Sequence, residues 1–272
     1  MRVPFIKMHG LGNDFVVLDN RSTAVPPMDA RLAAALADRH AGIGCDQLIL
    51  LEPSDVADMR MRIFNADGGE VAACGNATRA VGLLHGRSAR IETLAGILQT
   101  DAADGGITVD MGEPAFGWSE IPLAYAMDTL TMPVGWEQLQ APSAVNVGNP
   151  HVVFFVDDCD AVDLARLGPL IETDPLFPDR VNVNIATIDG LGAIRLRVWE
   201  RGAGLTLACG TGACATAVAA MRRRLAGRDV LVTLPGGQLN IVWGSDNRIR
   251  MTGPAAEAFR GTFDPAAYGV PA

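Results

Sequence analysis

The stretch Arg197-Val-Trp-Glu-Arg-Gly-Ala-Gly-Leu-Thr-Leu-Ala-Cys-Gly-Thr-Gly-Ala-Cys-Ala215 is the part of the sequence around which the fold is expected to form. It predicts a short apolar strand that ends at Trp199, a charged and glycine-rich loop, and a helix that begins at Cys209. The helix has no polar face before Arg222, and a helix that is apolar all round is normally buried. Its first turn would therefore direct unpaired N–H groups and a positive dipole end at whatever lies beside Cys209. Such a position can hold an anion and lower the pKa of a thiol.

The composition describes a globular chain and excludes several classes of partner. The 272 residues are 49% hydrophobic and carry a net charge of −9, which argues against nucleic acid or an anionic membrane as partner. No apolar run is long enough to span a bilayer, and residues 1–10 lack the apolar region of a signal peptide. Five cysteines form no disulfide framework, which favours a reducing, cytoplasmic location.

Lys7 is the only lysine, and this restricts the cofactor chemistry. A pyridoxal-phosphate enzyme needs a Schiff-base lysine, and a phosphate-binding Walker loop needs a lysine after a glycine-rich turn. Lys7 lies in an expected N-terminal strand and fits neither context. We therefore expect no cofactor and no metal.

The first half of the chain predicts alternating strands and helices. Asp29 is expected to cap a helix that ends near Arg39, and a second, apolar helix is expected to run from Cys74 to Gly86. Strands are expected at 3–8, 15–18, 48–51, 59–64, around Ile91 and Ile97, and at 107–111. Residues 113–142 contain prolines and little periodicity, and we interpret them as a linker and surface connection.

The second half of the sequence repeats the first at a nearly constant offset. Gly148-Asn149 follows Gly12-Asn13 at 136 residues, and Ala208-Cys209-Gly210 follows Ala73-Cys74-Gly75 at 135. Thr233–Gly236 follows Thr93–Gly96 at 140, which predicts that the second helix is longer by just over one turn. The common order of these matches indicates a duplicated domain.

The expected architecture is therefore two similar α/β (α+β) halves related by a pseudo-twofold axis. The N-terminal half would span residues 1–116 and the C-terminal half residues 117–259, with a C-terminal strand at 260–272 joining the first half. Equivalent positions would face each other across the axis, so that Cys74 and Cys209 flank one small ligand.

Two thiols on opposite sides of one ligand carbon suit a symmetric reaction, in which a proton is removed from one face and added to the other. One of Cys74 and Cys209 would be a thiolate and the other a thiol, with exchanged roles in the reverse direction. Each lies at a helix start, which favours the thiolate at both positions, and the two would titrate as a coupled pair. A ligand carboxylate would bind the N–H groups of the two helix starts, at residues Gly75, Asn76, Gly210 and Thr211.

The remaining polar residues describe a zwitterionic, carboxylate-rich ligand. Arg201 can bind a second carboxylate in bidentate fashion, and Glu200 can accept hydrogen bonds from an ammonium group. Side-chain amides stand at strand or loop ends in repeat-equivalent positions: Asn13, Gln47, Asn65, Asn149 and Asn182.

These residues and their order closely resemble the diaminopimelate epimerase family. The resemblance covers nearly the whole chain and is most specific at Glu200-Arg-Gly and Ala208-Cys-Gly-Thr-Gly. Its other motifs are Lys7-Met-His-Gly-Leu-Gly-Asn-Asp-Phe, Gly42-Ile-Gly-Cys-Asp-Gln, Asn65-Ala-Asp-Gly, Cys74-Gly-Asn, Gly148-Asn-Pro-His and Arg180-Val-Asn. Residues 123–142 match no motif of the family.

The resemblance implies cofactor-independent interconversion of LL- and meso-diaminopimelate, on the route to lysine and peptidoglycan. It also implies two pseudo-symmetric domains, each a mostly antiparallel, barrel-like sheet around a central helix. The family's catalytic pair falls on Cys74 and Cys209, and His151 and Glu200 match positions that adjust the thiol pKa values. Its substrate contacts fall on Asn13, Gln47, Asn65, Gly75, Asn76, Asn149, Asn182, Glu200, Arg201, Gly210 and Thr211.

The resemblance further implies a homodimer in which an aromatic residue of the C-terminal strand supports the interface. Here that position is Phe259, where the family commonly has Tyr. Dimerisation through this residue is therefore less firmly expected than the active site.

Several other polar residues have a simpler structural interpretation. A buried cysteine is usually a small hydrophobic residue, and we assign that role to Cys45, Cys159 and Cys214. His9, His40 and His85 are expected in turns or at the surface. Asp157-Asp158-Cys159-Asp160 could bind a metal, but helix capping and solvation explain it more simply.

Two other functions compete with the epimerase interpretation. A proline racemase or hydroxyproline epimerase would also use two thiols, but its first motif typically has Cys-Gly-His where this chain has Cys74-Gly-Asn, and its ligand has no distal carboxylate for Arg201. Alternatively, Cys74 and Cys209 could form a redox-sensing pair in a binding protein.

Overall fold

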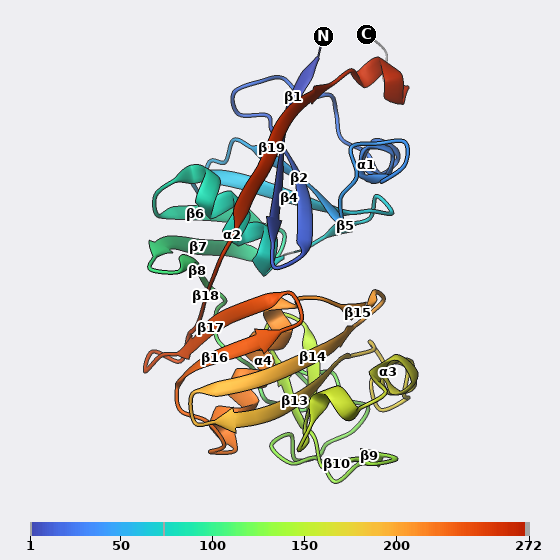
Figure 1. Cartoon of the computed structure of the whole chain (residues 1–272), viewed down its shortest axis with the longest axis vertical. Coiled ribbons are helices and arrows are strands. Elements are labelled where there is room, and N and C mark those ends of the chain that lie inside the picture. The colour runs from blue at the N-terminus through green and yellow to red at the C-terminus, as the bar shows by residue number, and fades with distance from the viewer. Residues whose placement is uncertain (1, 73, 270–272) are drawn as a thin grey trace. The chain divides into compact units, whose positions relative to one another are not determined.

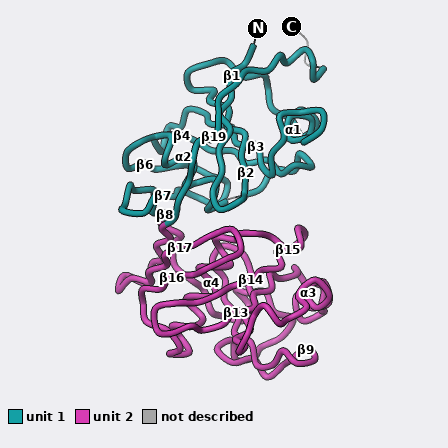
Figure 2. Tube along the Cα trace, viewed as in Figure 1, with its two compact units in different colours: residues 1–109, 253–272 teal, residues 110–252 magenta. Residues whose placement is uncertain are grey.

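A computed structural model describes residues 2–72 and 74–269, and it divides the chain into two compact units. Unit 1 combines the chain up to Val109 with the residues from Gly253 onwards, and unit 2 spans Asp110–Thr252 (Figure 2). The predicted mixed α/β fold with a mostly antiparallel sheet is confirmed (Figure 1). Among the described residues, no helix has the length and apolar character needed to cross a bilayer.

Unit 1 contains two α-helices and the strands from the N-terminal part of the chain, joined by one strand from the C-terminal part. The helices are α1 (Ala30–Ala37) and α2 (Gly75–His85). The strands are β1 (Val3–Gly10), β2 (Asn13–Asp19), β3 (Gln47–Glu52), β4 (Met59–Asn65), β5 (Glu70–Val71), β6 (Ala89–Thr93), β7 (Gly96–Ala103) and β19 (Ala256–Phe263). The 3₁₀ helix η2 (Pro265–Tyr268) follows β19.

Unit 2 contains α3 (Leu164–Glu172), α4 (Gly210–Arg222) and the 3₁₀ helix η1 (Cys159–Ala161). Its strands are β9 (Gly135–Trp136), β10 (Leu139–Gln140), β11 (Ser143–Asn146), β12 (Pro150–Phe155), β13 (Asn182–Gly190), β14 (Ala193–Glu200), β15 (Gly204–Thr206), β16 (Asp229–Leu234) and β17 (Gly237–Trp243). The strands β8 (Gly106–Asp110) and β18 (Ile249–Gly253) cross the boundary between the units.

The same succession of strand pairings occurs in both units. In unit 1, β1 pairs antiparallel with β2, β2 runs parallel to β3, and β3 pairs antiparallel with β4. In unit 2, β11, β12, β13 and β14 pair in the same order and directions. Each unit then places its buried helix, α2 or α4, before a strand that runs parallel to β4 or β14.

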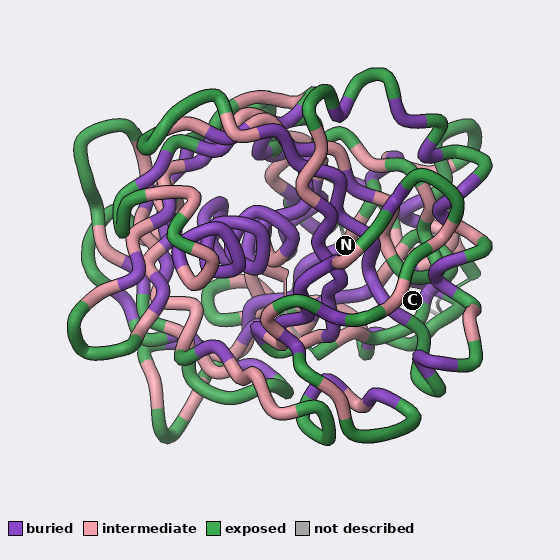
Figure 3. Tube along the Cα trace, turned by 90° about the horizontal axis from the view of Figure 1, so that it is seen from below, coloured by how far each residue is buried: buried purple, intermediate pink, exposed green. Residues whose placement is uncertain are grey.

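Helix α4 is almost entirely apolar, whereas α2 also buries the polar side chains of Asn76, Thr78 and Arg79. In α2 the residues Gly75–Gly82 are all buried, and in α4 the residues Gly212–Met221 are all buried. Figure 3 shows helical turns coloured purple as buried. Gly86 ends α2 in the left-handed conformation at φ 73°, as the sequence predicts for a glycine after a helix.

The second helix is longer than the first by less than the sequence offset predicts. The helix α2 has 11 residues and α4 has 13, so the prediction of more than one extra turn is wrong. The rest of the offset lies in the following loop, which is residues 86–88 in unit 1 and 223–228 in unit 2. Arg224, at φ 60°, helps to turn the chain out of α4.

The interpretation of residues 113–142 as a surface connection is wrong. Ile121, Leu123, Met132 and Leu139 are buried and belong to the core of unit 2, together with residues of α3 and β12. The segment has no helical or strand period because its apolar residues are spaced by turns and by the short β9–β10 hairpin. Burial here is contributed by single side chains rather than by one face of a regular element.

The C-terminal strand begins and ends earlier than expected. It was expected at residues 260–272, but β19 spans Ala256–Phe263 and pairs antiparallel with β1. Asp264 then caps η2, because its side chain accepts a hydrogen bond from the N–H of Ala266. Residues 270–272 of the expected strand lie outside the described residues.

Candidate active site

The two cysteines that the sequence singles out occupy the same position in their units. Cys74 is the N-cap residue of α2, and Cys209 is the N-cap residue of α4. Both have extended backbones, with φ and ψ of −149° and 113° for Cys74 and −125° and 109° for Cys209. Each thiol therefore stands at the positive end of a buried helix, where the first-turn N–H groups favour an anion.

The thiol of Cys74 lies beside two of the predicted amides. Its Sγ is 3.9 Å from Oδ1 of Asn13, and that oxygen also accepts a hydrogen bond from Nδ2 of Asn76 at 3.3 Å. The Nδ2 of Asn13 donates to Oδ2 of Asp46 at 3.0 Å. The carboxylate of Asp46 thus fixes the amide of Asn13 with its oxygen toward Cys74 and Asn76.

A charge network that the sequence analysis did not identify holds Asp46 and the turn before β2. Asp14 and Asp46 each accept a hydrogen bond from the other's backbone N–H, and Arg39 bridges their carboxylates at 2.6 and 2.7 Å. Lys7 donates to Oδ2 of Asp14 at 2.5 Å. Burial alone would raise the pKa of Asp14, but the hydrogen bonds from Arg39 and Lys7 lower it well below its usual range. The only lysine of the chain therefore holds this turn together.

Gln47 and Asn65 form a second predicted pair in unit 1. They are register partners on β3 and β4, and Nε2 of Gln47 donates to Oδ1 of Asn65 at 3.0 Å. The Oε1 of Gln47 is buried and has no hydrogen-bond partner within the part of the chain that the structure describes. A buried acceptor without a donor is uncommon in proteins and marks a place where a ligand donor would be favourable.

Cys209 is more deeply enclosed than Cys74. It is 4% exposed, and its Sγ accepts from the N–H of Gly212 at 3.4 Å and lies 3.5 Å from Oγ1 of Thr211. Burial raises the pKa of this thiol well above its usual value, and the carboxylate of Glu200 raises it further. Loss of hydration and the Glu200 charge thus oppose the effect that the helix N-terminus is expected to have on this thiol.

Glu200 is itself a perturbed group. Burial raises the pKa of its carboxyl, and the neighbouring side chains of Thr206 and Cys209 partly offset this rise. Buried carboxyl groups that face a thiol are typical of sites that move protons. The family resemblance implies a pKa-modulating role for Glu200, and this role stays a prediction.

His151 reaches Cys209 through a chain of hydrogen bonds rather than by contact. Its ring is fully buried, with Nε2 bonded to Oδ1 of Asn149 at 2.9 Å and Nδ1 bonded to Nδ2 of Asn184 at 3.1 Å. In the tautomer in which Nδ1 accepts from Asn184, the proton of the neutral ring is on Nε2 and is donated to Asn149. Nδ2 of Asn149 then donates to Oγ1 of Thr211 at 3.3 Å, beside Cys209. Burial lowers the pKa of His151 to about 3, so the ring is neutral at physiological pH.

Asn184 is a site residue that the sequence analysis missed. It is fully buried, and an ideal Cβ at Gly212 would lie 2.8 Å from its Oδ1, so only glycine fits at 212. Asn184 follows Ile49 by 135 residues, so the repeat-equivalent position in the first half of the chain is apolar. A search for positions that are apolar in one repeat and polar in the other could have identified Asn184.

Asn182 and Arg201 are joined through the backbone. The N–H of Arg201 donates to Oδ1 of Asn182 at 3.0 Å, and Nδ2 of Asn182 donates to the carbonyl of Pro150 at 2.8 Å. The guanidinium of Arg201 is exposed and donates to the carbonyl of Asp179 at 2.8 Å. Gly75 and Gly210, the other two predicted site residues, begin α2 and α4 directly after the cysteines.

The structure thus brings the predicted residues together in four groups. These are Asn13 with Cys74 and Asn76, Gln47 with Asn65, Asn149 with His151, Thr211, Cys209 and Glu200, and Asn182 with Arg201.

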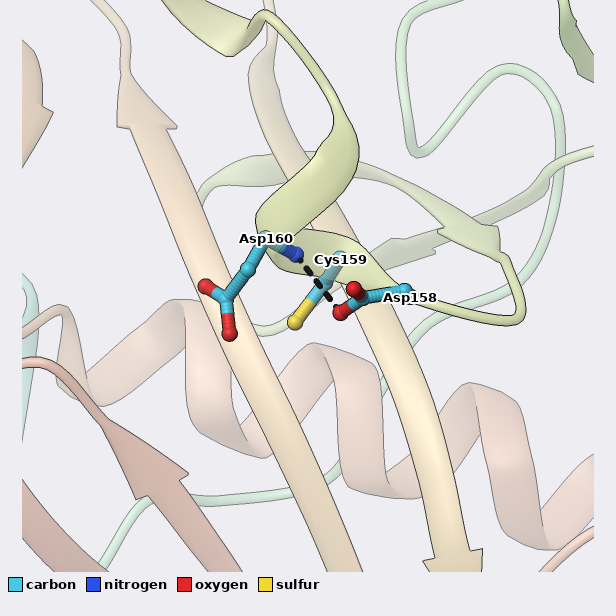
Figure 4. Close-up of side chains that lie close together, drawn as sticks. All are labelled: Asp158, Cys159 and Asp160. Carbon is cyan, nitrogen blue, oxygen red and sulfur yellow. Dashed lines mark hydrogen bonds between the residues drawn. The ribbon is translucent and has the colours of Figure 1, made fainter.

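The other cysteines and the acidic cluster have structural surroundings. Cys45, Cys159 and Cys214 are at most 1% exposed, which confirms that they pack as small apolar residues. Asp158 caps η1 by accepting from the N–H of Asp160 at 3.1 Å, as Figure 4 shows. Arg195 is ion-paired with both aspartates at 3.3 and 3.1 Å, so their carboxylates have a counter-charge from the protein.

The fold places the chain among mixed α/β proteins with a mostly antiparallel sheet. A phenazine biosynthesis protein of the PhzF family from Bacillus anthracis has a similar structure, with a TM-score of 0.70 at 17% identity over 97% of this chain and 99% of that chain. A hydroxyproline epimerase from Agrobacterium vitis is similar with a TM-score of 0.63 at 17% identity, over 98% of this chain and 95% of that chain. These likenesses show the shared fold.

Sequence comparison then defines the family. The family model for diaminopimelate epimerase matches residues 5–117 and 143–257. A diaminopimelate epimerase from Erythrobacter litoralis is 70% identical over 97% of this chain and 98% of its own, and one from Rhizorhabdus wittichii is 66% identical over 99% and 98%. The chain belongs to the diaminopimelate epimerase family.

Proposed function

We propose that this chain epimerises LL-diaminopimelate to meso-diaminopimelate by a two-base mechanism that needs no cofactor. The observation that carries the proposal is that two equivalent buried helices each begin at a cysteine, Cys74 and Cys209. Membership of the family supports diaminopimelate as the substrate, because a relative that is 70% identical is a diaminopimelate epimerase. The product is a precursor of lysine and peptidoglycan.

In the proposed reaction the two thiols act on opposite faces of one α-carbon. A thiolate takes the α-proton, the electron pair is delocalised onto the α-carboxylate, and the other thiol gives its proton to the opposite face. Charge and atoms balance, because the site begins and ends with one thiolate and one thiol. The reverse reaction exchanges the two roles. The scheme requires both cysteines to reach the same substrate.

The helix N-termini supply the electrostatic part of the mechanism. The N–H groups of Gly75, Asn76, Gly210 and Thr211 would bind the α-carboxylate, whose negative charge grows as the carbanion forms. Donors fixed by a folded helix need no reorganisation during the reaction, and for this reason they lower its barrier. Each unit would wrap its sheet around this helix as a barrel, which the complete burial of α4 from Gly212 to Met221 supports.

The remaining predicted residues would recognise the second amino-acid end of the substrate. Arg201 would bind the distal carboxylate, and Glu200 would accept from an ammonium group and adjust the pKa of Cys209. The neutral ring of His151 would act on Cys209 through Asn149. The amides Asn13, Gln47, Asn65, Asn149 and Asn182 would complete the contacts, and the buried, unpartnered Oε1 of Gln47 supports a donor on the ligand.

We further propose that the enzyme is cytoplasmic and forms a homodimer. Free cysteines in the described part of the chain suit a reducing compartment. Phe259 on β19 is 52% exposed and packs edge-on against Phe5, which leaves an aromatic surface for a partner subunit. Sedimentation at micromolar concentration would distinguish dimer from monomer.

The direct test is incubation with LL-diaminopimelate in deuterated water without added cofactor. We expect the meso isomer to form with deuterium at one α-carbon. Turnover of proline or hydroxyproline in its place would contradict the substrate assignment. Proton exchange without any change of configuration would contradict the two-base scheme.

A further inference from the structure

A buried acid outside the predicted site lies at the C-terminal end of α3. Glu172 is the last residue of this helix and is 5% exposed. Buried carboxylates are rare unless they are paired, because a charge that leaves water must find compensating donors. The helix packs against β13, β14 and β15, so Glu172 faces the strands that carry the Glu200–Arg201 loop.

The two oxygens of Glu172 hold the chain on both sides of that loop. Oε2 accepts from the indole Nε1 of Trp199 at 2.7 Å, and Oε1 accepts from the backbone N–H of Gly202 at 2.9 Å. Trp199 and Gly202 directly flank Glu200 and Arg201. The carboxylate of Glu172 therefore holds both the residue before the Glu200–Arg201 loop and the residue after it.

The helix is also packed tightly enough to set the position of the indole. An ideal Cβ at Gly168 would lie 2.5 Å from ring atoms of Trp199, so the ring lies directly on the helix backbone. Gly168 is one turn before Glu172, on the same face of α3. The indole is thus held by its ring at Gly168 and by its N–H at Glu172.

Two further groups restrain the same loop. Oδ1 of Asn182 accepts from the N–H of Arg201 at 3.0 Å, so the successive N–H groups of residues 201 and 202 both donate to side chains. Nη1 of Arg180 is 3.5 Å from Oε1 of Glu172 and supplies a counter-charge. With its backbone fixed, Arg201 keeps only side-chain freedom.

We propose that Glu172 is a positioning residue that fixes the Glu200–Arg201 loop so that Arg201 meets the distal carboxylate of the substrate. This inference rests on the proposed function, in which Arg201 binds that carboxylate. Glu172 touches no reacting atom in this scheme. Its effect is to reduce the loop freedom that would otherwise be lost when substrate binds.

The test is a double-mutant cycle between E172Q and R201A, with steady-state kcat and KM for LL-diaminopimelate. Glutamine has the same shape, but it turns an NH2 group toward one of the two donors, Trp199 Nε1–H or Gly202 N–H. We expect E172Q to raise KM by roughly tenfold, as the loss of one charged hydrogen bond would, with a smaller change in kcat. In the R201A background E172Q should change KM by less than about twofold, because the Arg201 contact that Glu172 positions is then absent.

The matched control is E137Q. Glu137 is exposed and forms a bidentate pair with Arg166 at 2.7 and 2.8 Å in the same unit. Because exposed ion pairs contribute little, E137Q should leave KM and kcat at wild-type values.

The outcomes separate this inference from the proposed function. If R201A raises KM and E172Q does not, or if the two effects multiply, the positioning role is overturned while the role of Arg201 stands. If R201A leaves KM unchanged, the role proposed for Arg201 is contradicted, and the inference falls with it. If E172Q does not fold, W199F removes the indole donor while keeping an aromatic ring beside Gly168, and a KM that rises only when Arg201 is present supports the inference. An unchanged KM in W199F would then overturn it.

Discussion

The surroundings of Cys74 and of Cys209 differ although the two cysteines occupy equivalent positions. Asn13 and Asn149 are repeat-equivalent amides, but Asn13 is held through its NH2 group and Asn149 through its oxygen. The carboxylate of Asp46 accepts from Asn13, which leaves the amide oxygen toward Cys74. His151 is bonded to the oxygen of Asn149, which leaves the amide NH2 toward Thr211 beside Cys209.

The two units therefore share the succession of strand pairings and differ in the polar partners of their cysteines. The backbone places a thiol at a helix start in both units, with the same succession of strand pairings before it. The thiol of Cys74 faces the amide oxygen of Asn13. Cys209 faces the backbone N–H of Gly212 and the hydroxyl of Thr211, together with the negative charge of Glu200. A substrate with one end at the reacting carbon and the other end distant from it would suit such an asymmetric pair of thiol surroundings.

The largest expected effect is loss of either thiol. C74A and C209A should each lower kcat/KM for epimerisation by at least about a thousandfold, because each removes one of the two proton-transfer groups. Chiral separation of the LL and meso isomers measures this. Cys214, in the same helix as Cys209, provides the control: C214A should retain near wild-type kcat/KM. A fully active C74A or C209A variant would refute the equivalence of the two positions.

A smaller effect is expected from removal of the Glu200 charge. The carboxylate raises the pKa of Cys209, so E200Q should lower that pKa and move the corresponding limb of the pH–rate profile to lower pH. The loss of a buried polar contact at the site should also reduce kcat/KM by roughly tenfold to a hundredfold. Rates from pH 6 to 10 provide the measurement. An unshifted limb would show that Glu200 does not act on the thiol.

A still smaller effect on kcat/KM is expected from removal of the Asp46 carboxylate, which orients Asn13. D46A should leave the amide free to rotate, which weakens the contact to Cys74 and reduces kcat/KM by about tenfold, as loss of one hydrogen bond to a charged group would. Asp157 is an exposed acid of unit 2, and D157A should be indistinguishable from wild type. Equal activity of D46A and D157A would mean that the orientation of Asn13 has no role.

His151 should affect stability in acid. Its pKa is about 3 in the folded chain, below the value of about 6.5 expected in the unfolded chain. Between these values the unfolded state binds the additional proton, so the stability associated with the neutral ring is present above about pH 6.5 and is lost as pH falls toward 3. From pH 7 to pH 4 this loss amounts to at most about 3 kcal/mol.

Urea unfolding of wild type and H151Q at pH 7 and pH 4 measures this contribution. H151Q should lose less stability than wild type on acidification, because glutamine has no proton to bind. An equal loss in both proteins would show that the ring is already charged or solvated in the folded state.

The sequence predicted the parts of the fold that have a clear period. The strands from β1 to β4 and the apolar helices α2 and α4 were expected near their observed positions, because buried elements have regular hydrophobic patterns. Residues 113–142 escaped this reasoning because their buried side chains, such as Met132, are isolated between turns. Helix α3 was missed, and it contains Gly168 and Pro169 in its interior.

Site residues that belong to a sequence motif could be predicted. The protonation and orientation of their side chains could not, because these depend on tertiary contacts. Cys74, Cys209 and Glu200 were identified from their motifs. The high pKa of Cys209 could not be read from the sequence, because it depends on burial and on the Glu200 charge. Asp46, Asn184 and Glu172 act through side chains that are distant in sequence, so no local pattern marks them.

The most direct test of the central claim follows deuterium early in the reaction. LL-diaminopimelate is converted to a small extent in deuterated water, and both the meso product and the recovered LL substrate are examined by mass spectrometry. If two different thiols remove and deliver the proton, the product carries one deuterium and the recovered substrate carries almost none. Comparable deuterium in the recovered substrate would mean that one base serves both faces, and would contradict the paired roles of Cys74 and Cys209.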